Sequence, residues 1–138
     1  MKTPHPLRAV AALLAALLLA LLAACSSSNT PDEVVKTFVS AAAKGDADTM
    51  LAHVSTKGFS DSDLTMAKGK MNMMAAAAQA SAQKRGGFKS VEITESKIDS
   101  DGKTATVQFK EKFGDGTEGS GEHFALLLED GHWKIKLK

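Results

Sequence analysis

The chain has 138 residues, a length that fits a single domain behind a short N-terminal segment. Its 17 Lys and Arg residues are balanced by 16 Asp and Glu residues without a long basic run, so the charge argues against a nucleic-acid or anionic-lipid surface. Cys25 is the only cysteine, which excludes an internal disulfide and leaves the residues after it without a thiolate metal site or a cysteine nucleophile.

The first 24 residues predict a cleaved signal peptide. Lys2 and Arg8 form a short positive segment, and residues 9–22 contain only Ala, Val and Leu. A run of this length suits the core of a signal peptide, whereas a membrane-spanning helix needs about 20 apolar residues. A permanent transmembrane helix is therefore not expected.

The next segment, Leu22-Ala23-Ala24-Cys25, resembles the lipobox of bacterial lipoproteins. The resemblance implies cleavage between Ala24 and Cys25 and a diacylglyceryl thioether on Cys25, often with a third, amide-linked chain. Stable anchoring takes more than one chain, and this lipid supplies it. The alternative is an ordinary signal peptide followed by a chance cysteine.

The expected organisation has three parts: a signal peptide (1–24), a lipidated cysteine with a polar tether (25–30) and a folded domain (31–138). The expected location is the cell envelope, with membrane attachment through lipid on Cys25. Ser26 stands where an aspartate is associated with inner-membrane retention, so a cell with two membranes would carry the protein on the outer membrane, facing the periplasm.

Three helices are predicted at the start of the domain. The first begins at Pro31 with Thr30 as its cap and ends at Gly45, the second follows Asp46, and the third follows Ser60. Apolar residues recur at spacings of three and four in the first helix (Val34, Val35, Phe38, Val39, Ala42, Ala43), the second (Met50, Leu51, Val54) and the third (Leu64, Ala67, Met71, Met74, Ala78, Ala82). Gly69 allows a kink or break near residues 68–70 as an alternative.

From Phe88 the apolar period changes to two, which predicts four antiparallel strands joined by turns at residues 99–102, 114–116 and 130–131. The last turn, Asp130-Gly131, sets Leu128 opposite Trp133 and Leu126 opposite Ile135 on one apolar face. The fold class is α+β, with three N-terminal helices packed on a curved four-stranded antiparallel sheet.

Two segments carry a family resemblance: Thr30-Pro31-Asp32-Glu33-Val34-Val35-Lys36 and Asp130-Gly131-His132-Trp133-Lys134-Ile135. Together with the order of elements between them, they resemble bacterial lipoproteins of the domain of unknown function 4878 family. That family is similar to the nuclear transport factor 2-like, or cystatin-like, cone fold. The resemblance implies a cone that encloses either a ligand cavity or a packed core.

An enzyme of the ketosteroid isomerase type is considered because the same cone fold houses such enzymes. Their chemistry needs an acid or base in an apolar pocket and a donor for the developing oxyanion. The chain has no Tyr, and most of its sheet acids are expected on the strand faces opposite the apolar residues: Glu92, Glu95, Glu111, Glu118 and Glu122. No catalytic residue and no enzymatic activity are expected.

A metal site is not expected either. In the predicted hairpin, His123 and His132 lie at opposite ends of the ladder, too far apart to share an ion. The methionines Met71, Met73 and Met74 suggest a Cu(I) site, but packing of Met71 and Met74 in the core is favoured, because thioethers fill irregular gaps. No cofactor is predicted.

The expected role is a non-enzymatic envelope lipoprotein whose domain binds an apolar small molecule or a neighbouring envelope protein. Eight residues are predicted to line the ligand cavity: Met71, Met74, Val107, Phe109, Phe124, Leu126, Trp133 and Ile135. A plain core would need the same residues. The second class of function is a structural or immunity-type interaction module that uses its polar sheet face and no cavity.

Overall fold

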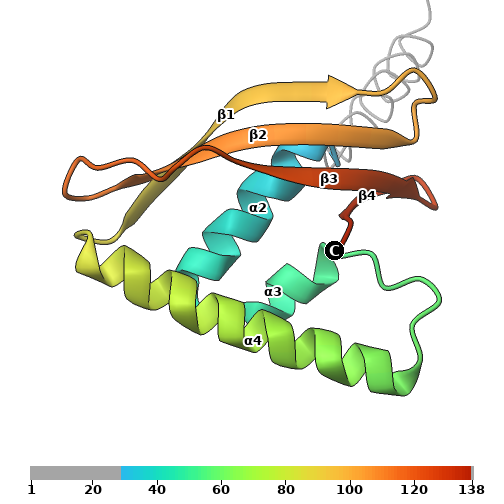
Figure 1. Cartoon of the computed structure of the whole chain (residues 1–138), viewed down its shortest axis with the longest axis horizontal. Coiled ribbons are helices and arrows are strands. Elements are labelled where there is room, and N and C mark those ends of the chain that lie inside the picture. Colours follow the sequence, from blue (N-terminus) through green and yellow to red (C-terminus); the bar gives the residue numbers. More distant parts are fainter. Residues whose placement is uncertain (1–28, 138) are drawn as a thin grey trace, which may run out of the picture.

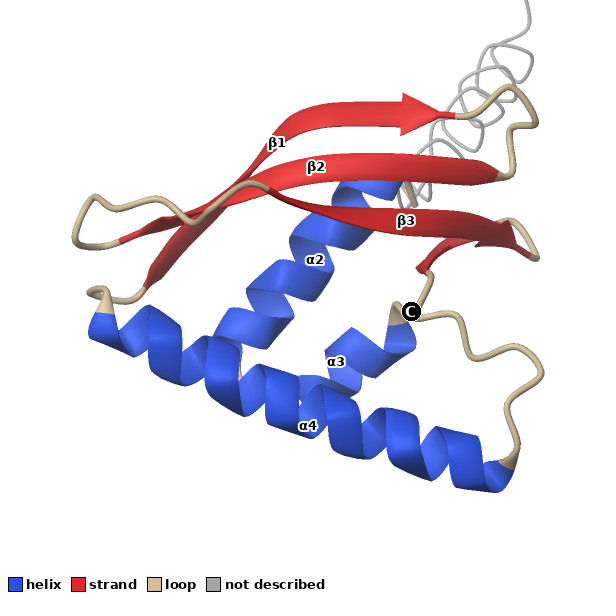
Figure 2. Ribbon diagram, in the orientation of Figure 1, coloured by secondary structure: helices blue, strands red, loops and turns tan. Residues whose placement is uncertain are grey.

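The computed structural model describes residues 29–137, so Ala24 and Cys25 lie outside the described residues. Three helices precede a single sheet (Figures 1 and 2), in the order α2 (Pro31–Lys44), α3 (Ala47–Ala52), α4 (Asp61–Lys84), β1 (Phe88–Ile98), β2 (Thr104–Phe113), β3 (Glu122–Glu129) and β4 (His132–Ile135). The predicted α+β class is confirmed. Within this part of the chain, no helix combines the length and the hydropathy needed to cross a membrane.

The helices begin and end where their capping residues predict. The Thr30 hydroxyl accepts the Glu33 N–H at 3.3 Å, and Gly45 ends α2 in the left-handed conformation, with φ of 78°. At the start of α4, Ser60 and Asp63 form a capping box in which each side chain accepts the other's backbone N–H. Local chemistry therefore sets these boundaries.

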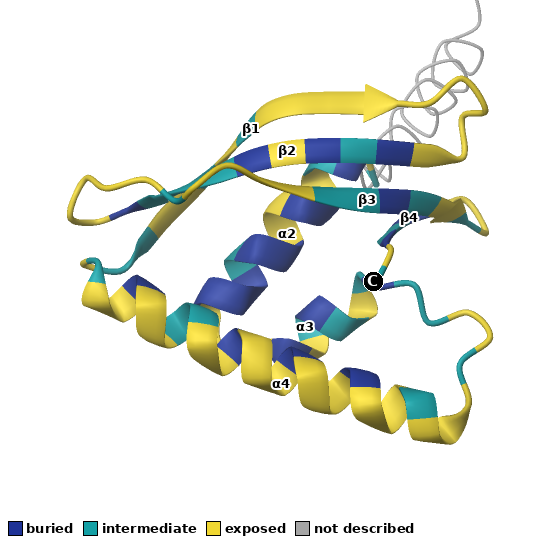
Figure 3. Cartoon of the chain, viewed as in Figure 1, coloured by how far each residue is buried: buried dark blue, intermediate teal, exposed yellow. Residues whose placement is uncertain are grey.

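The long helix α4 is unbroken across Gly69, so a break near residues 68–70 is wrong. It packs against α2 and α3 with one narrow flank, and Figure 3 shows most of its surface exposed. Leu64 and Met74, which were expected in the core, are 38% and 37% exposed. The helix approaches its neighbours through small residues around one methionine, namely Ala67, Met71, Ala75 and Ala82.

The sheet has the order β1-β2-β3-β4 with antiparallel pairing throughout. The predicted hairpin register is confirmed, with Leu126 opposite Ile135 and Leu128 opposite Trp133. The outer edge of β4 is covered as well, because Val54 forms a parallel bridge with Ile135. The short segment after α3 thereby extends the sheet by one bridge.

The core lies between the concave face of the sheet and the helices. The helix α2 packs against β1, β2 and β4 on one side and against α3 and α4 on the other. Phe124 of β3 meets the ring of Phe38 edge-on at 5.2 Å and stacks on Phe109 at 5.3 Å. The core residues run from Val34 to Ile135, so this segment has the complete hydrophobic core of a domain that can fold alone.

A bend separates the β2–β3 turn from β3. Lys112 bridges Glu118 and Phe109 pairs with Glu122, so three residues on the β3 side face two on β2. The extra residue lies in the stretch 119–121, and Gly119 N–H donates to the Glu111 carbonyl at 2.8 Å. The stretch with Gly119 and Gly121 therefore bends the chain just before β3 begins.

Two acids depart from their predicted placement. Glu111 lies directly opposite Val91, and Glu122 lies directly opposite Phe109, so both belong to the core-facing set of positions. Burial raises the pKa of Glu111, the negative charge of Glu122 raises it further, and Arg85 lowers it. The expectation that the sheet acids lie on the face opposite the apolar residues is wrong for Glu111 and Glu122. In β2, apolar and polar residues alternate, and Glu111 occupies a position where this alternation would place an apolar residue.

The burial of Met71 can be tested against a matched methionine on the same helix. Met71 is 0% exposed and Met73 is 76% exposed. Met71→Ala is expected to lower the free energy of unfolding by about 2–5 kcal/mol, because it leaves a cavity in the core, whereas Met73→Ala is expected to change it by less than about 0.5 kcal/mol. Urea denaturation followed by circular dichroism measures both, and equal losses would contradict this packing.

The Glu111 carboxyl predicts a pH-dependent stability. Because its folded-state pKa is raised above the usual 4.5, its ionised form destabilises the fold at neutral pH, and the penalty disappears as the pH falls through that range. Glu111→Gln is expected to stabilise the domain near pH 7 and to have little effect near pH 4. Chemical denaturation at both pH values measures the difference.

Glu92→Gln is the control of opposite sign. Its hydrogen bond and charge interaction with Lys112 lower the pKa of Glu92, so the ionised carboxylate stabilises the fold above its unfolded pKa and the effect is lost as the pH falls. Glu92→Gln should therefore weaken the domain near pH 7. If Glu92→Gln and Glu111→Gln changed the free energy of unfolding in the same direction near pH 7, the placement of Glu111 on the concave side would be contradicted.

Candidate functional site

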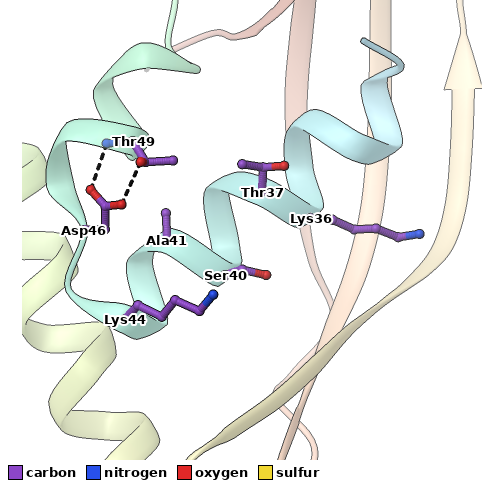
Figure 4. A pocket seen from close by; sticks show the side chains of 7 residues that line it. All are labelled: Lys36, Thr37, Ser40, Ala41, Lys44, Asp46 and Thr49. Carbon is purple, nitrogen blue, oxygen red and sulfur yellow. Dashed lines mark hydrogen bonds between the residues drawn. The ribbon is translucent and has the colours of Figure 1, made fainter. Parts of the chain in front are cut away.

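A polar pocket of about 340 Å³ lies between α2 and the start of α3, lined by Lys36, Thr37, Ser40, Ala41, Lys44, Asp46 and Thr49 (Figure 4). Asp46 caps α3 by accepting bonds from the hydroxyl and the backbone N–H of Thr49, and these bonds lower its pKa. The two lysines point away from this pair. Its polar groups do not converge on one point, so we regard this pocket as a solvated surface.

An apolar pocket of about 190 Å³ lies between α4 and the end of the sheet, and we call it the inner pocket. It is lined by residues of α2 (Phe38), α4 (Lys70, Met74), β3 (His123, Phe124, Ala125) and the chain end around β4 (Ile135, Lys136, Leu137). Most of its wall is aromatic or aliphatic. Apolar walls with a few polar groups are typical of ligand sites.

The inner pocket exists because β4 is shorter than β3. The last hydrogen bond of the hairpin runs from the Lys136 N–H to the Ala125 carbonyl at 2.9 Å. Within residues 29–137, the preceding residues of β3, from Glu122 to Phe124, pair with no residue of β4. Phe124, held by the rings of Phe38 and Phe109, then forms a rigid wall of the opening.

A second pocket of about 380 Å³, the outer pocket, adjoins the first along the same flank of α4. It is lined by Phe59, Asp63, Met66, Ala67, Lys70 and Leu137, and it shares Lys70 and Leu137 with the inner pocket. The α4 residues recur at spacings of three and four, which places them on one helix flank. We call the two pockets together the α4 groove. The volume of the outer pocket lies within the range of about 300–1,000 Å³ typical of ligand pockets.

The charges around the inner pocket are cationic. The charged residues among its lining are Lys70 and Lys136, and none of its lining residues is acidic. Neither lysine has an ion pair within residues 29–137. Asp63 in the outer pocket is already bonded to Ser60, which lowers the pKa of Asp63. The groove therefore combines apolar walls with uncompensated positive charge.

The eight residues predicted to line a cavity fall into two groups. Three of them, Met74, Phe124 and Ile135, line the inner pocket. The other five are buried in the core and line neither pocket of the groove: Met71, Val107, Phe109, Leu126 and Trp133. The centre of the cone is packed at these positions, and the open space lies at its rim.

Several groove residues were not predicted as site residues. Lys70 lies four residues from both Met66 and Met74, so its place on their flank follows from helical spacing once Met74 is known to face the groove. No comparable signal marks Phe59, because it lies in the loop before α4 and reaches the groove only through the path of that loop.

Residues 29–137 contain no group of three His, Cys, Asp or Glu side chains able to hold a metal ion. The Nδ1 atom of His53 lies 2.8 Å from the Thr49 carbonyl oxygen, while His123 and His132 are exposed. Met71 is buried in the core and Met73 is exposed on the outer side of α4. These side chains are thus dispersed over the fold.

Two of the solved structures that are similar to this chain come from Campylobacter jejuni and Rhodopseudomonas palustris. The first is described as a "Putative NTF2-like transpeptidase" from Campylobacter jejuni; it has 23% sequence identity and a TM-score of 0.72 over 79% of this chain and 99% of the other. The second, a SEC-C motif containing protein from Rhodopseudomonas palustris, has 18% identity and a TM-score of 0.52 over 85% of this chain and 83% of the other. The first similarity shows a nuclear transport factor 2-like fold.

No curated protein sequence matches the chain. One protein family does, and its description is "Domain of unknown function (DUF4878)". The match covers residues 23–136, which includes every helix and strand described above. The chain therefore belongs to the domain of unknown function 4878 family.

Proposed function

We propose that this domain is a non-catalytic binding module that takes up an apolar small molecule in the α4 groove. The observation that carries the proposal is the inner pocket, whose apolar wall is formed by the partly exposed Met74 and Phe124 together with the buried Phe38 and Ile135. Met74 is 37% exposed there, so a ligand would remove apolar surface from water without unfolding any element. Apolar burial of this kind is the main source of affinity in such pockets.

The proposal assigns no chemistry to the groove. Glu111 and Glu122 occupy positions on the concave face of the sheet, but neither lines a pocket of the groove. Its only acid, Asp63, is engaged in the capping box of α4. A general acid or base facing the ligand is what an isomerase of the ketosteroid type would need, and the groove offers none.

We further propose that the domain is held in the cell envelope by lipid on Cys25, on the outer membrane if the cell has two. The support comes from the lipobox-like segment and from Asn29, whose side chain accepts the N–H of Trp133. The tether would thus join the domain beside β4. The groove opens around Leu137, beyond the other end of that strand.

The structural or immunity-type alternative relied on the polar sheet face with Lys134 and Lys136. The ammonium group of Lys134 donates to the Ala52 carbonyl, and Lys136 lines the inner pocket. Both lysines are therefore engaged by the fold or the groove. For this reason we prefer the groove to the sheet face as the binding surface.

The groove can be tested with the uncharged apolar fluorophore N-phenyl-1-naphthylamine, titrated into the domain expressed as residues 26–138. The fluorophore is expected to bind with enhanced emission. Met74→Trp should weaken binding by about tenfold or more, because the indole would fill the inner pocket and remove about 1.4 kcal/mol or more of contact. Fluorescence titration measures both affinities.

Met73→Trp is the matched control, because Met73 lies beside Met74 on α4 but lines neither pocket. It should bind the fluorophore like the unmodified domain. Absence of binding to the unmodified domain, or equal losses in the two variants, would show that the groove is not an apolar binding site. Circular dichroism of each variant establishes that it is folded.

The lipid anchor can be tested in a bacterial host supplied with labelled palmitate. The unmodified protein is expected to incorporate the label and to sediment with membranes, because acylation at Cys25 supplies more than one chain. Cys25→Ser should lose both properties, and Ser26→Ala should keep them. A soluble, unlabelled protein that begins at Cys25 would instead indicate an ordinary signal peptide.

A further inference from the structure

We propose that the α4 groove selects a single-chain anionic amphiphile, with the alkyl chain on the apolar walls and the acidic head group between Lys70 and Lys136. This inference rests on the proposed function and specifies its ligand. The common chemistry is one alkyl chain with a carboxylate or phosphate head, as in a fatty acid or a lysophospholipid.

Charge complementarity carries the head-group part of the inference. Lys70 comes from α4 and Lys136 follows β4, so two lysines from different elements line the inner pocket. His123 adds a third polar group that can donate a hydrogen bond to an acid. Since no acid of residues 29–137 lines the inner pocket, an anionic head group there would be attracted by the lysines without competition from a lining carboxylate of the described residues.

The surroundings strengthen this attraction. An ion pair beside apolar walls is less screened than one in bulk water, so a head group next to Phe124 and Leu137 interacts more strongly with the lysines than it would on an open surface. Both lysines lack an ion pair within the described part of the chain. An anion would therefore not have to displace a partner already bound.

The shape of the groove carries the alkyl-chain part. The inner and outer pockets adjoin at Lys70 and Leu137, so the apolar surface continues along α4 instead of forming one round cavity. Met66 and Met74 flank this path, and their flexible thioethers can adapt to a chain. Each additional buried methylene should tighten binding roughly fourfold until the chain exceeds the groove.

The test is displacement of N-phenyl-1-naphthylamine from the domain by four ligands below their micelle concentrations. Decanoic and myristic acid probe chain length, myristoyl lysophosphatidylglycerol carries the phosphate head, and monomyristoylglycerol is the uncharged control. Myristic acid and the lysophospholipid should compete about tenfold better than the neutral lipid of the same chain length, as expected for one charge-assisted hydrogen bond. Decanoic acid should compete less well than myristic acid, because it buries fewer methylenes. The anionic head group that binds more tightly, carboxylate or phosphate, is the one that the groove prefers.

The double variant Lys70→Gln/Lys136→Gln should reduce the affinity for the anionic ligands about tenfold more than the affinity for the neutral lipid, because only the anions lose a charge interaction. Lys68→Gln/Lys97→Gln removes the same charge from two exposed positions outside both pockets and should change neither. The advantage of the anions over the neutral lipid should also shrink as salt is raised.

The outcomes separate this inference from the proposed function. If the fluorophore binds but anionic and neutral ligands compete equally, or if the two double variants behave alike, the inference is wrong and apolar binding stands. If the fluorophore does not bind the folded domain, the proposed function and this inference both fail.

Discussion

The packing of α2 against the concave face of the sheet is the contact on which the rest of the structure depends. Phe38 from the helix meets Phe124 of β3, and Phe124 in turn stacks on Phe109 of β2. These three rings join one helix to the two central strands. Because α2 also contacts α3 and α4, it connects the sheet to the outer helical layer, and the domain needs no disulfide for its core.

The same packing explains why the open space lies at the rim of the cone. The centre of the concave face is filled by buried residues such as Val107 and Leu126, while β4 is too short to cover the start of β3. On the other side, α4 reaches α2 through a narrow stripe of alanines around Met71 and leaves its neighbouring flank exposed. The α4 groove is the space between this flank and the end of the sheet.

The course of the chain follows closely from local rules, and the departures have local causes. Caps at Thr30 and Ser60 and the register of the last hairpin agree with the sequence patterns, because each depends on residues close together in the chain. The helical periodicity of α4 predicted more buried residues than the structure has. Periodicity shows which residues share a helix face, but not how much of that face a neighbouring helix covers. For the same reason, Met74 was assigned to the core stripe although it borders open space.

The sequence by itself determined the element order, the turns and the apolar faces, since these rest on spacing and on the backbone preferences of single residues. It also supports the expected lipid attachment at Cys25. Only the tertiary structure decided that Met74 and Phe124 border an open pocket while Trp133 and Leu126 are core, and that Lys70 and Lys136 line the same pocket. Pockets form where elements distant in sequence fail to cover one another, and no local pattern records that failure.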